Sequence, residues 1–151
     1  MPKPLEISLE RTRLLSLNFQ RKQHVDEESL PEIVEMGVSL SGSSNYNYRQ
    51  KQLYVRLFVS LDQDDIPFTL DATYEGLFQL SKRPKKEEVQ RLERINCPAI
   101  LFPFLRECIA EVTRRGGLDP VHLPAINFVE LSKDSLKAEE RKKTARKKKQ
   151  G

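Results

Sequence analysis

The sequence predicts an α+β fold, in which a four-stranded antiparallel sheet is followed by two helices. Four segments between residues 5 and 74 alternate apolar and polar side chains with a period of two, as half-buried strands do. The second, third and fourth segments are joined by polar stretches too short to hold a crossover helix, which favours antiparallel strands. After Gly76 the pattern changes to helical spacing, so strands and helices are segregated along the chain.

The first two strands are each expected to bury one apolar face. The first segment places apolar side chains at alternate positions, namely Leu5, Ile7, Leu9, Leu15, Leu17 and Phe19. The second segment does the same at Val34, Met36, Val38 and Leu40. Residues 41–45 (Ser-Gly-Ser-Ser-Asn) then predict a turn, because these residue types favour turns. The link of residues 21–31 is longer and can cross the sheet instead of forming a hairpin.

The third and fourth strands show the same alternation. The apolar face of the third segment consists of Leu53, Val55, Leu57, Val59 and Leu61. Its opposite face carries Tyr54, Arg56 and Phe58. The polar residues 62–65 predict a turn. The fourth segment aligns Phe68, Leu70, Ala72 and Tyr74. These faces indicate a sheet that is buried on one side.

The apolar helix is the most informative element. It is expected to open near Pro98 and to end at Gly116-Gly117, a helix stop. Pro103 removes a backbone donor in its first turns, so it either kinks the helix or marks its start. Its apolar side chains cover more than one stripe and are Ile100, Leu101, Phe102, Phe104, Leu105, Cys108, Ile109 and Val112. So wide a face indicates burial against another subunit or an apolar ligand.

Two further segments flank this helix. A short polar helix is expected at residues 85–92, with Pro84 at its first turn. Residues 118–131 are expected to be extended, because Pro120 and Pro124 oppose helix formation.

Composition indicates one globular, soluble domain. With 38% hydrophobic and 32% charged residues in 151, the chain can bury a core. No apolar run approaches the ~20 residues that span a bilayer. The start of the chain lacks the apolar stretch of a signal peptide. The two cysteines, Cys97 and Cys108, are expected as buried free thiols, and we therefore expect a cytoplasmic location.

The charge of the chain is concentrated at its end. Residues 133–151 hold nine Lys or Arg and three acids, a net charge of +6, which leaves residues 1–132 at −2. We take residues 1–132 as one domain and residues 133–151 as a basic tail, expected to be disordered. A nucleic-acid site on the domain is disfavoured. The tail stays a candidate for contact with nucleic acid or an acidic surface, and a solubilising role is the favoured alternative.

The sequence offers no pattern typical of an enzyme or a metalloprotein. It has no glycine-rich phosphate loop and no paired-cysteine metal spacing, and His24 and His122 lie far apart. Arg106-Glu107 is interpreted as a structural or interface ion pair. We therefore expect no cofactor, no metal ion and no catalytic activity.

Two motifs in the second half of the chain resemble the SecB family of protein-export chaperones. They are CPAILFPFLRECI at residues 97–109 and LPAINFVEL at residues 123–131. Asp71 and EGLF at residues 75–78 are weaker matches, and the similarity covers roughly residues 5–131. The resemblance implies a four-stranded antiparallel sheet with helices packed on one face. It also implies a homotetramer, in which protomers pair sheet edges and two dimers stack through the long helix.

The function that the resemblance implies is that of a holdase. SecB-like proteins bind unfolded, largely apolar client polypeptides in surface grooves and keep them translocation-competent for Sec-dependent export. Such grooves need exposed apolar area of tolerant shape and backbone groups that can pair with an extended client. The candidate groove residues, for which core packing is the competing interpretation, are Met36, Val38, Leu40, Phe68 and Phe128. The candidate oligomer interface on the long helix consists of Ile100, Leu101, Phe104, Leu105, Cys108, Ile109 and Val112.

The chain departs from the family at the acidic surface that docks the export motor SecA. The two positions in the first strand are the uncharged Ser16 and Gln20, whereas Asp71 keeps its charge. An aromatic residue of the groove is replaced by Ser132. Losing charges weakens a charge-complementary contact. Two functions therefore stay open: a holdase for Sec-dependent export, and a SecB-like chaperone dedicated to one client, such as an antitoxin of a toxin–antitoxin system, with little SecA binding.

Overall fold

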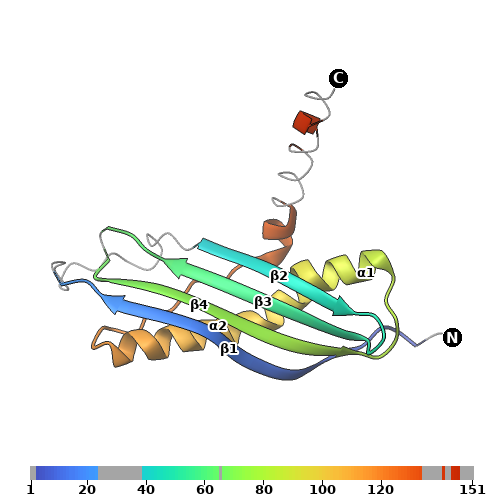
Figure 1. Ribbon diagram of the computed structural model, residues 1–151, viewed down its shortest axis with the longest axis horizontal. Coiled ribbons are helices and arrows are strands. Elements are labelled where there is room, and N and C mark those ends of the chain that lie inside the picture. Colours follow the sequence, from blue (N-terminus) through green and yellow to red (C-terminus); the bar gives the residue numbers. More distant parts are fainter. Residues whose placement is uncertain (1–2, 24–38, 65, 134–140, 142–143, 147–151) are drawn as a thin grey trace.

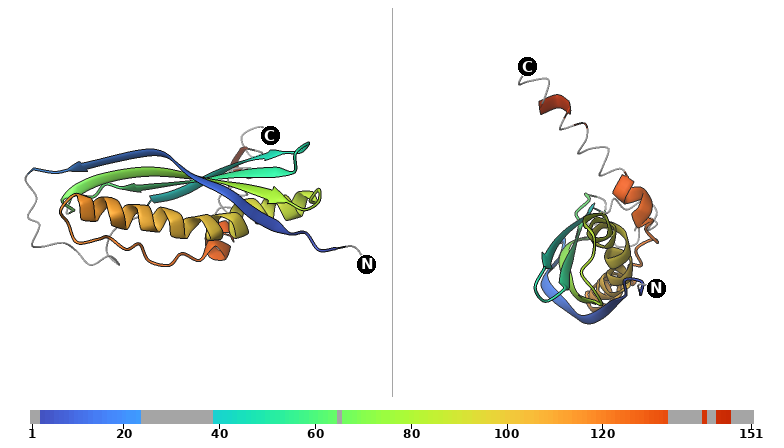
Figure 2. Two further views of the ribbon diagram at one scale, coloured as in Figure 1. Left: turned by 90° about the horizontal axis from the view of Figure 1, so that it is seen from below. Right: turned by 90° about the vertical axis from the view of Figure 1, so that its right-hand side faces the viewer.

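The computed structural model describes residues 3–23, 39–64, 66–133, 141 and 144–146. In this part the chain forms one four-stranded antiparallel sheet with a helical layer on one face (Figure 1, Figure 2). The strands are β1 (Ile7–Arg21), β2 (Ser39–Asn47), β3 (Gln52–Leu61) and β4 (Phe68–Leu80). The helices are α1 (Lys86–Arg91), the π-helical turn η3 (Leu92–Asn96) and α2 (Cys97–Arg115). The expected α+β fold, with its helices on one face of the sheet, is confirmed.

The strand order β1-β4-β3-β2 places β1 and β2 at opposite edges of the sheet. β1 pairs with β4, with Leu17 opposite Ala72. The chain between β1 and β2 therefore joins the two opposite edges and does not close a hairpin. The register between β1 and β4 shifts twice, at residues 9–11 and 14–16. Such irregularities bend a strand and change which side chains face the core.

The turn predicted at residues 41–45 is wrong. These residues lie inside β2, where Ser43 is opposite Arg56 of β3. Strand pairing with β3 overrides the local turn preference of serine and glycine here, because strand formation depends strongly on its neighbours. The upstream positions expected in this strand, residues 34–38, lie outside the described residues.

The turn between β2 and β3 lies at residues 48–51 instead. The side-chain oxygen of Asn47 accepts hydrogen bonds from the backbone N–H groups of Arg49 and Gln50, at 3.1 and 3.2 Å. Lys51 completes the turn with a φ of 55°, which lies in the left-handed region. A lysine in this conformation carries no turn signal that the sequence alone reveals.

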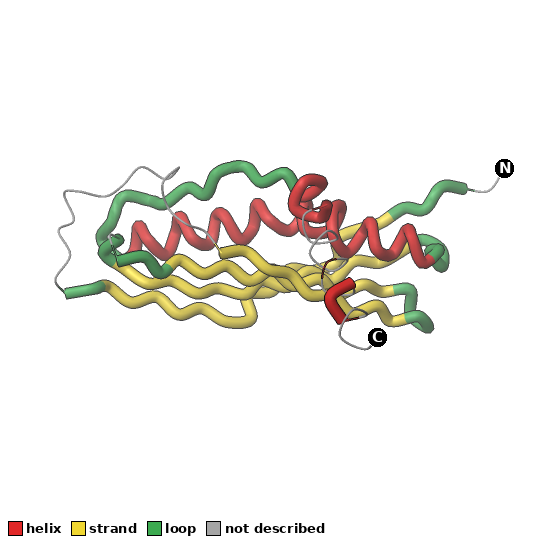
Figure 3. The backbone as a smooth tube through the Cα atoms, turned by 90° about the horizontal axis from the view of Figure 1, so that it is seen from above, coloured by secondary structure: helices red, strands yellow, loops and turns green. Residues whose placement is uncertain are grey.

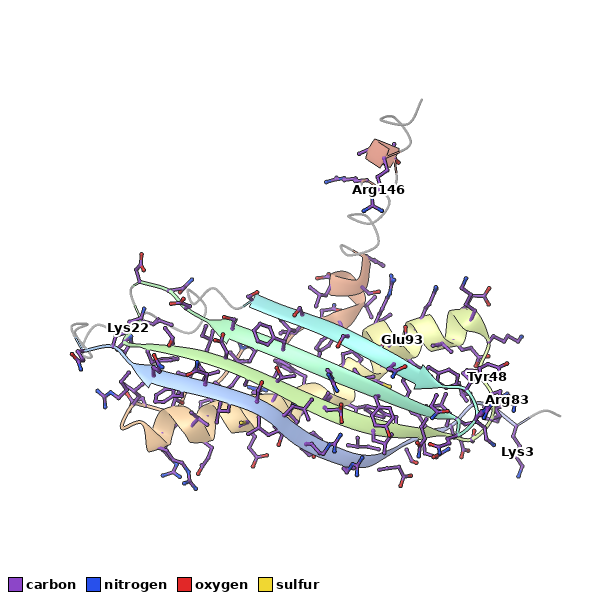
Figure 4. The ribbon with its side chains drawn as sticks, in the orientation of Figure 1. Lys3, Lys22, Tyr48, Arg83, Glu93 and Arg146 are labelled. Carbon is purple, nitrogen blue, oxygen red and sulfur yellow. The ribbon has the colours of Figure 1, made fainter. Side chains whose placement is uncertain are left out.

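A cation–π contact holds this turn next to the helical layer. The guanidinium of Arg83 lies 5.0 Å from the centre of the Tyr48 ring (Figure 4). Tyr48 also packs edge-on against Tyr46, with ring centres 5.9 Å apart. An exposed cation–π contact contributes about 0.5–1 kcal/mol. The end of the hairpin is thereby attached to the segment that leads into α1.

The inner face of the sheet forms the hydrophobic core. The β3 residues on this face are at most 2% exposed and are Leu53, Val55, Leu57, Val59 and Leu61. The matching buried residues of β4 are Phe68, Leu70, Ala72, Phe78 and Leu80. α2 covers this face with the fully buried side chains of Leu101, Leu105 and Ile109. The predicted alternation of the third strand is confirmed, and β4 continues beyond Tyr74 to Leu80.

One continuous helical run, α1–η3–α2, replaces the two separate helices that the sequence predicted. In η3 the N–H of Cys97 donates to the carbonyl of Leu92, which is the i to i+5 bond of a π-helix. α2 then passes through Pro103, so this proline does not mark the start of the helix. The predicted end is confirmed: Gly116 caps α2 and Gly117 adopts a φ of 80°.

Residues 118–127 form an extended strap along α2, on the side away from the sheet (Figure 2, Figure 3). Leu118, Val121 and Leu123 of this strap are buried. The hydroxyl of Thr113 in α2 accepts the backbone N–H of Val121 at 2.9 Å and donates within α2. α2 is therefore covered on two sides by its own chain.

The extended segment predicted to reach residue 131 ends earlier. Residues 128–133 are helical. The side-chain oxygen of Asn127 accepts the N–H groups of Val129 and Glu130 at 3.1 and 3.3 Å. This is the hydrogen bonding of a helix N-cap, and it outweighs the effect of the two prolines upstream.

A small part of the basic tail is described. Residues 133, 141 and 144–146 are helical, and the rest of the tail lies outside the described residues, so its disorder stays a prediction. None of the helices in the described part of the chain combines the length and apolar character needed to cross a bilayer.

Candidate functional site

A groove of about 460 Å³ lies between β2 and the helical layer. Residues 40–44 of β2 line it, and among them Leu40, Gly42 and Ser44 lie on the helical side because their partners on β3 belong to the buried face. Leu57 of β3 and Pro98 at the start of α2 also line the groove. The groove thus connects an edge strand of the sheet with the point where η3 becomes α2.

The second wall of the groove comes from the helical residues 128–133. Phe128, Leu131 and Ser132 line the groove from this side. The Phe128 ring packs edge-on against Phe102 of α2, with ring centres 5.7 Å apart, and is 6% exposed. Leu131 is 40% exposed and offers the accessible apolar contact of this wall. The Phe128 ring, which packs against Phe102, and the exposed Leu131 together give this wall an apolar surface.

The charged residues of the groove come from η3. Glu93 and Arg94 are adjacent in sequence and both line the groove; Glu93 is labelled in Figure 4. One carboxylate and one guanidinium give this side no net charge. The groove therefore does not select a ligand by the sign of its charge, which suits apolar polypeptide segments of varied sequence.

β2 is an edge strand, and this gives the groove backbone hydrogen-bonding groups as well as side chains. In the part of the chain that the structure describes, β3 is the strand that pairs with β2, and no strand pairs with its other edge. An unpaired strand edge accepts an extended peptide by β-augmentation. Side chains of such a peptide alternate, so every second one would point towards the groove.

The structure places the predicted groove residues in three different settings. Leu40 and Phe128 line the groove. Phe68 is fully buried and packs against Phe19, with ring centres 5.7 Å apart, so it belongs to the core and does not line this groove. The positions of Met36 and Val38 lie outside the described residues.

Sequence reasoning missed several groove residues. The sequence predicted that Leu131 lies in an extended segment. In the structure Asn127 caps a short helix that contains Leu131, and Leu131 lines the groove beside β2. Gly42 and Ser44 were assigned to a turn. The alternation of the second strand, continued past Leu40 to residues 42 and 44, was the available signal for both.

The predicted oligomer interface is only partly accessible in one protomer. Leu101, Leu105 and Ile109 are fully buried within the single chain. Ile100 and Phe104 are 39% and 37% exposed. Cys108 and Val112 are half-buried. These four side chains remain the candidate interface residues on α2.

The three positions predicted for SecA docking share the open face of the sheet, which the helices do not cover. Asp71 is opposite Asn18 of β1, and its neighbours along β4 are buried on the inner face. Ser16 and Gln20 lie on the same face, because they pair with Thr73 and Thr69, which are two positions from Asp71 in either direction. The three positions therefore lie on one face of the sheet, and Asp71 is the charged residue among them.

An ion cluster lies further along the same open face. The carboxylate of Glu75 accepts hydrogen bonds from Nε and Nη2 of Arg13 and, at 2.9 Å, from Nε of Arg56. The Glu75 side chain is only 3% exposed, although the open face carries no helix. Burial raises the pKa of Glu75, but the hydrogen bonds and charges of the two arginines outweigh it, so the pKa lies below its ordinary value of 4.5.

Neither cysteine is an activated nucleophile. Burial, with a smaller effect from Glu93, raises the pKa of Cys97 to about 12. Burial also raises the pKa of Cys108, helped by the nearby Glu107. Within the residues that the structure describes, no three histidine, cysteine or acidic side chains gather in a way that could hold a metal ion. His24 lies outside those residues.

Comparison with known proteins identifies the family. The family model described as preprotein translocase subunit SecB matches residues 5–139, and the chain belongs to the SecB family. The match runs past residue 131 into the segment assigned to the tail. Relatives named Protein-export protein SecB include that of Bartonella bacilliformis, 35% identical over 103 residues, and that of Neisseria meningitidis, 36% identical over 115 residues. The Bartonella match covers 68% of this chain and 61% of that relative, and the Neisseria match covers 75% of this chain and 76% of that relative.

Solved structures confirm the fold. A SecB-like chaperone of Mycobacterium tuberculosis, solved in complex with a ChAD peptide from an antitoxin, matches with a TM-score of 0.62 at 18% identity, over 80% of this chain and 90% of that one. A protein of unknown function from Streptococcus agalactiae matches with a TM-score of 0.55 at 16% identity, over 82% of this chain and 100% of that one.

Proposed function

We propose that the protein is a holdase, which binds unfolded preproteins in the groove beside β2 and keeps them translocation-competent for Sec-dependent export. The observation that carries the proposal is that β2, an edge strand among the described residues, lies beside a groove whose facing wall carries the apolar side chains of Phe128 and Leu131. The names of the relatives support the export step. Binding alone suffices for this function, so no cofactor and no catalytic step are involved, and the cytoplasm is the compartment where preproteins await export.

The energetics suit a binder of low sequence specificity. A client leucine or phenylalanine that is buried against Phe128 and Leu131 contributes about 1.5–3 kcal/mol. Backbone pairing with β2 is independent of client sequence. The ordering of a flexible client opposes both terms, so one groove gives weak to moderate affinity. Several grooves on one oligomer would raise it through avidity.

The accessible apolar side chains support an assembly of several protomers, which we propose to be a homotetramer. Ile100 and Phe104 of α2 are 39% and 37% exposed. At the β1 edge, Leu14, Leu15 and Leu17 are 40–42% exposed. Burying both sets would pair protomers through β1 and stack dimers through α2. Light scattering of the purified protein measures the mass, and a monomer at micromolar concentration would contradict this assembly.

Two side chains on one short helix allow a direct test of the groove. Leu131 and Val129 lie on the same short helix and are 40% and 43% exposed, but Leu131 lines the groove and Val129 does not. We expect Leu131→Glu to weaken binding of a fluorescently labelled unfolded client about 10-fold, because it places a charge on the apolar wall. Val129→Glu should change binding less than about 2-fold. Equal effects of the two variants would contradict the proposed site.

A second candidate function is a SecB-like chaperone dedicated to one client, such as an antitoxin, with little SecA binding. The observation that favours it is the loss of charge at Ser16 and Gln20 beside Asp71 on the open face. The double variant Ser16→Asp/Gln20→Glu should strengthen SecA binding several-fold if Asp71 belongs to a docking site. Tight SecA binding by the unmodified protein, unchanged in the double variant and in Asp71→Asn, would contradict the dedicated function.

A further inference from the structure

The ion cluster on the open face has a hollow above it. A pocket of about 400 Å³ is lined by the Arg13–Glu75–Arg56 cluster together with polar side chains of β2 and β3. Ser43 and Asn45 of β2 face it because their partners on β3, Arg56 and Tyr54, lie on the open face. The pocket therefore lies across the sheet from the groove, which the inner face of β2 lines.

The two arginines present unused hydrogen-bond donors to this pocket. Arg56 reaches Glu75 through Nε, and its side chain is 55% exposed. Arg13 reaches the same carboxylate through Nε and Nη2, and its side chain is 47% exposed. A guanidinium has five N–H donors arranged to receive a carboxylate with two parallel bonds. Glu75 orients both side chains but neutralises only one of their two charges.

The charge of this end of the open face is positive. Arg11 is opposite Leu77 and so lies on the same face as Arg13. Arg11, Arg13 and Arg56 share this end of the face with Glu75 and with Glu10, whose carboxylate accepts the hydroxyl of Ser8, so three positive charges stand against two negative ones, whereas Asp71 lies further along β4. Charged surfaces of one sign attract partners of the other sign and fix their orientation.

We propose that this pocket docks an acidic side chain of an extended peptide segment in a partner protein. The partner's carboxylate would bind the outer edge of the Arg56 and Arg13 guanidiniums. Apolar side chains beside it would contact Tyr54, Leu77 and Phe58, which is 38% exposed. A site of this kind recognises a segment that combines acidic and apolar side chains. Its charge is positive, whereas the charge of an acidic docking surface is negative.

The same features disfavour a polyphosphate chain as the partner. The negative charge of Glu75 lies within hydrogen-bond distance of both arginines and opposes a second, densely charged anion. The remaining lining consists of uncharged hydroxyl, amide and phenol groups. A single carboxylate with an apolar neighbour matches this lining better than a nucleic-acid backbone does.

The pocket and the proposed client groove can be tested separately. They lie mainly on opposite faces of the sheet, but Ser43 and Ser44 of β2 line both. Arg56 lines only the pocket and Leu131 only the groove, so variants at these two residues distinguish the sites. A failure of one of the two proposals leaves the other testable.

The experiment uses the full chain and a labelled 12-residue peptide of alternating glutamate and leucine, with a glutamine–leucine peptide as its control. We expect fluorescence anisotropy to show binding of the acidic peptide that weakens as salt increases. Arg56→Gln should weaken it about 10-fold and Arg56→Lys several-fold, because lysine keeps the charge but loses the fork. Arg49→Gln, the same charge change in the exposed turn, should change it less than about 2-fold.

One further variant separates docking from a purely structural role. Glu75→Gln frees both guanidiniums and removes the opposing charge, so it should tighten binding of the acidic peptide several-fold. A structural cluster without a docking role predicts no binding of the peptide by either protein. Binding that Arg56→Gln leaves unchanged in a folded protein, or stronger competition by tripolyphosphate than by the acidic peptide, would overturn the proposal.

Discussion

The two faces of the sheet use alternate residues of the same strands for opposite purposes. On the inner face of β3 and β4, side chains such as Leu57 and Leu70 are at most 2% exposed and pack under α2. On the open face the same strands carry Arg56, Asp71 and Glu75, and the buried carboxylate there is covered by arginine side chains instead of a helix. Because the side-chain period of a strand is two, one face can hold the fold together while the other changes its partners.

The largest difference between the faces is expected in stability. Leu70→Ala removes a fully buried side chain and leaves a cavity, which should lower the free energy of unfolding by about 2–5 kcal/mol. Phe58→Ala removes a larger side chain from the open face, where it is 38% exposed, and should cost only about 1 kcal/mol. Urea denaturation of both variants measures the difference. A cost for Phe58→Ala equal to that for Leu70→Ala would show that the open face is covered, for example by another subunit.

The next largest effect concerns the strap behind α2. Thr113→Val removes the hydroxyl that accepts the Val121 N–H and leaves this buried donor without a partner. The free energy of unfolding should fall by about 1–3 kcal/mol. Thr113→Ser keeps the hydroxyl and serves as the control. Amide hydrogen exchange at Val121 should become faster in the valine variant, and unchanged exchange would show that the hydroxyl does not hold the strap.

On the open face, Glu75→Gln should have a smaller effect on stability, about 1 kcal/mol at neutral pH, because both arginines can be hydrated when the carboxylate is lost. The pKa of Glu75 is lower in the folded protein than its ordinary value of 4.5, so its contribution is present above that pH and is lost as the pH falls through the folded pKa. Unfolding curves between neutral and acidic pH should converge for the two proteins. Parallel curves would contradict the assignment of this titration to Glu75.

The smallest expected effect is in the reactivity of the thiols. With a pKa of about 12, Cys97 is almost entirely protonated at pH 8, and its side chain is fully buried. Native protein should therefore leave Cys97 unlabelled by iodoacetamide, whereas the half-buried Cys108 should label slowly. Labelling in denaturant provides the control. Rapid modification of Cys97 in the native protein would show that the inner face opens readily.

Much of the inner face could be predicted from the sequence, because burial leaves a periodic signal. The alternation from Leu53 to Leu61 identified β3, and Gly116-Gly117 identified the end of α2. The family motifs at residues 97–109 and 123–131 gave the helical layer on one side. Each of these features depends on residues that are close in sequence and face one environment.

The errors arose where one segment depends on another that is distant in sequence. The serines of β2 were assigned to a turn because only the pairing with β3 makes them a strand. The breadth of the apolar face of α2 was attributed to another subunit or an apolar ligand, and the structure buries Leu101, Leu105 and Ile109 within the one chain. Phe68 was a groove candidate through the family resemblance, with core packing as the alternative, and the structure buries it fully.

The candidate groove was predictable only in part for the same reason. Leu40 and Phe128 were found through the family resemblance, and the structure brings them to one groove. Leu131 joins them because Asn127 starts a new helical turn, which a pattern of prolines does not show. The ion cluster on the open face was missed because Arg13, Arg56 and Glu75 come from three strands and meet only across the sheet.

The π-helical turn η3 has a consequence for how the groove can change between related chains. A π turn is what remains when one residue is inserted into an α-helix, since the ring closed by each backbone bond is one residue longer. Deleting one residue between Leu92 and Asn96 would let the run rewind as a regular α-helix and rotate α1 by about 100° relative to α2. Glu93 and Arg94 would then leave the groove. The charge beside the groove is therefore open to change by a single codon gained or lost, with the sheet and α2 left intact.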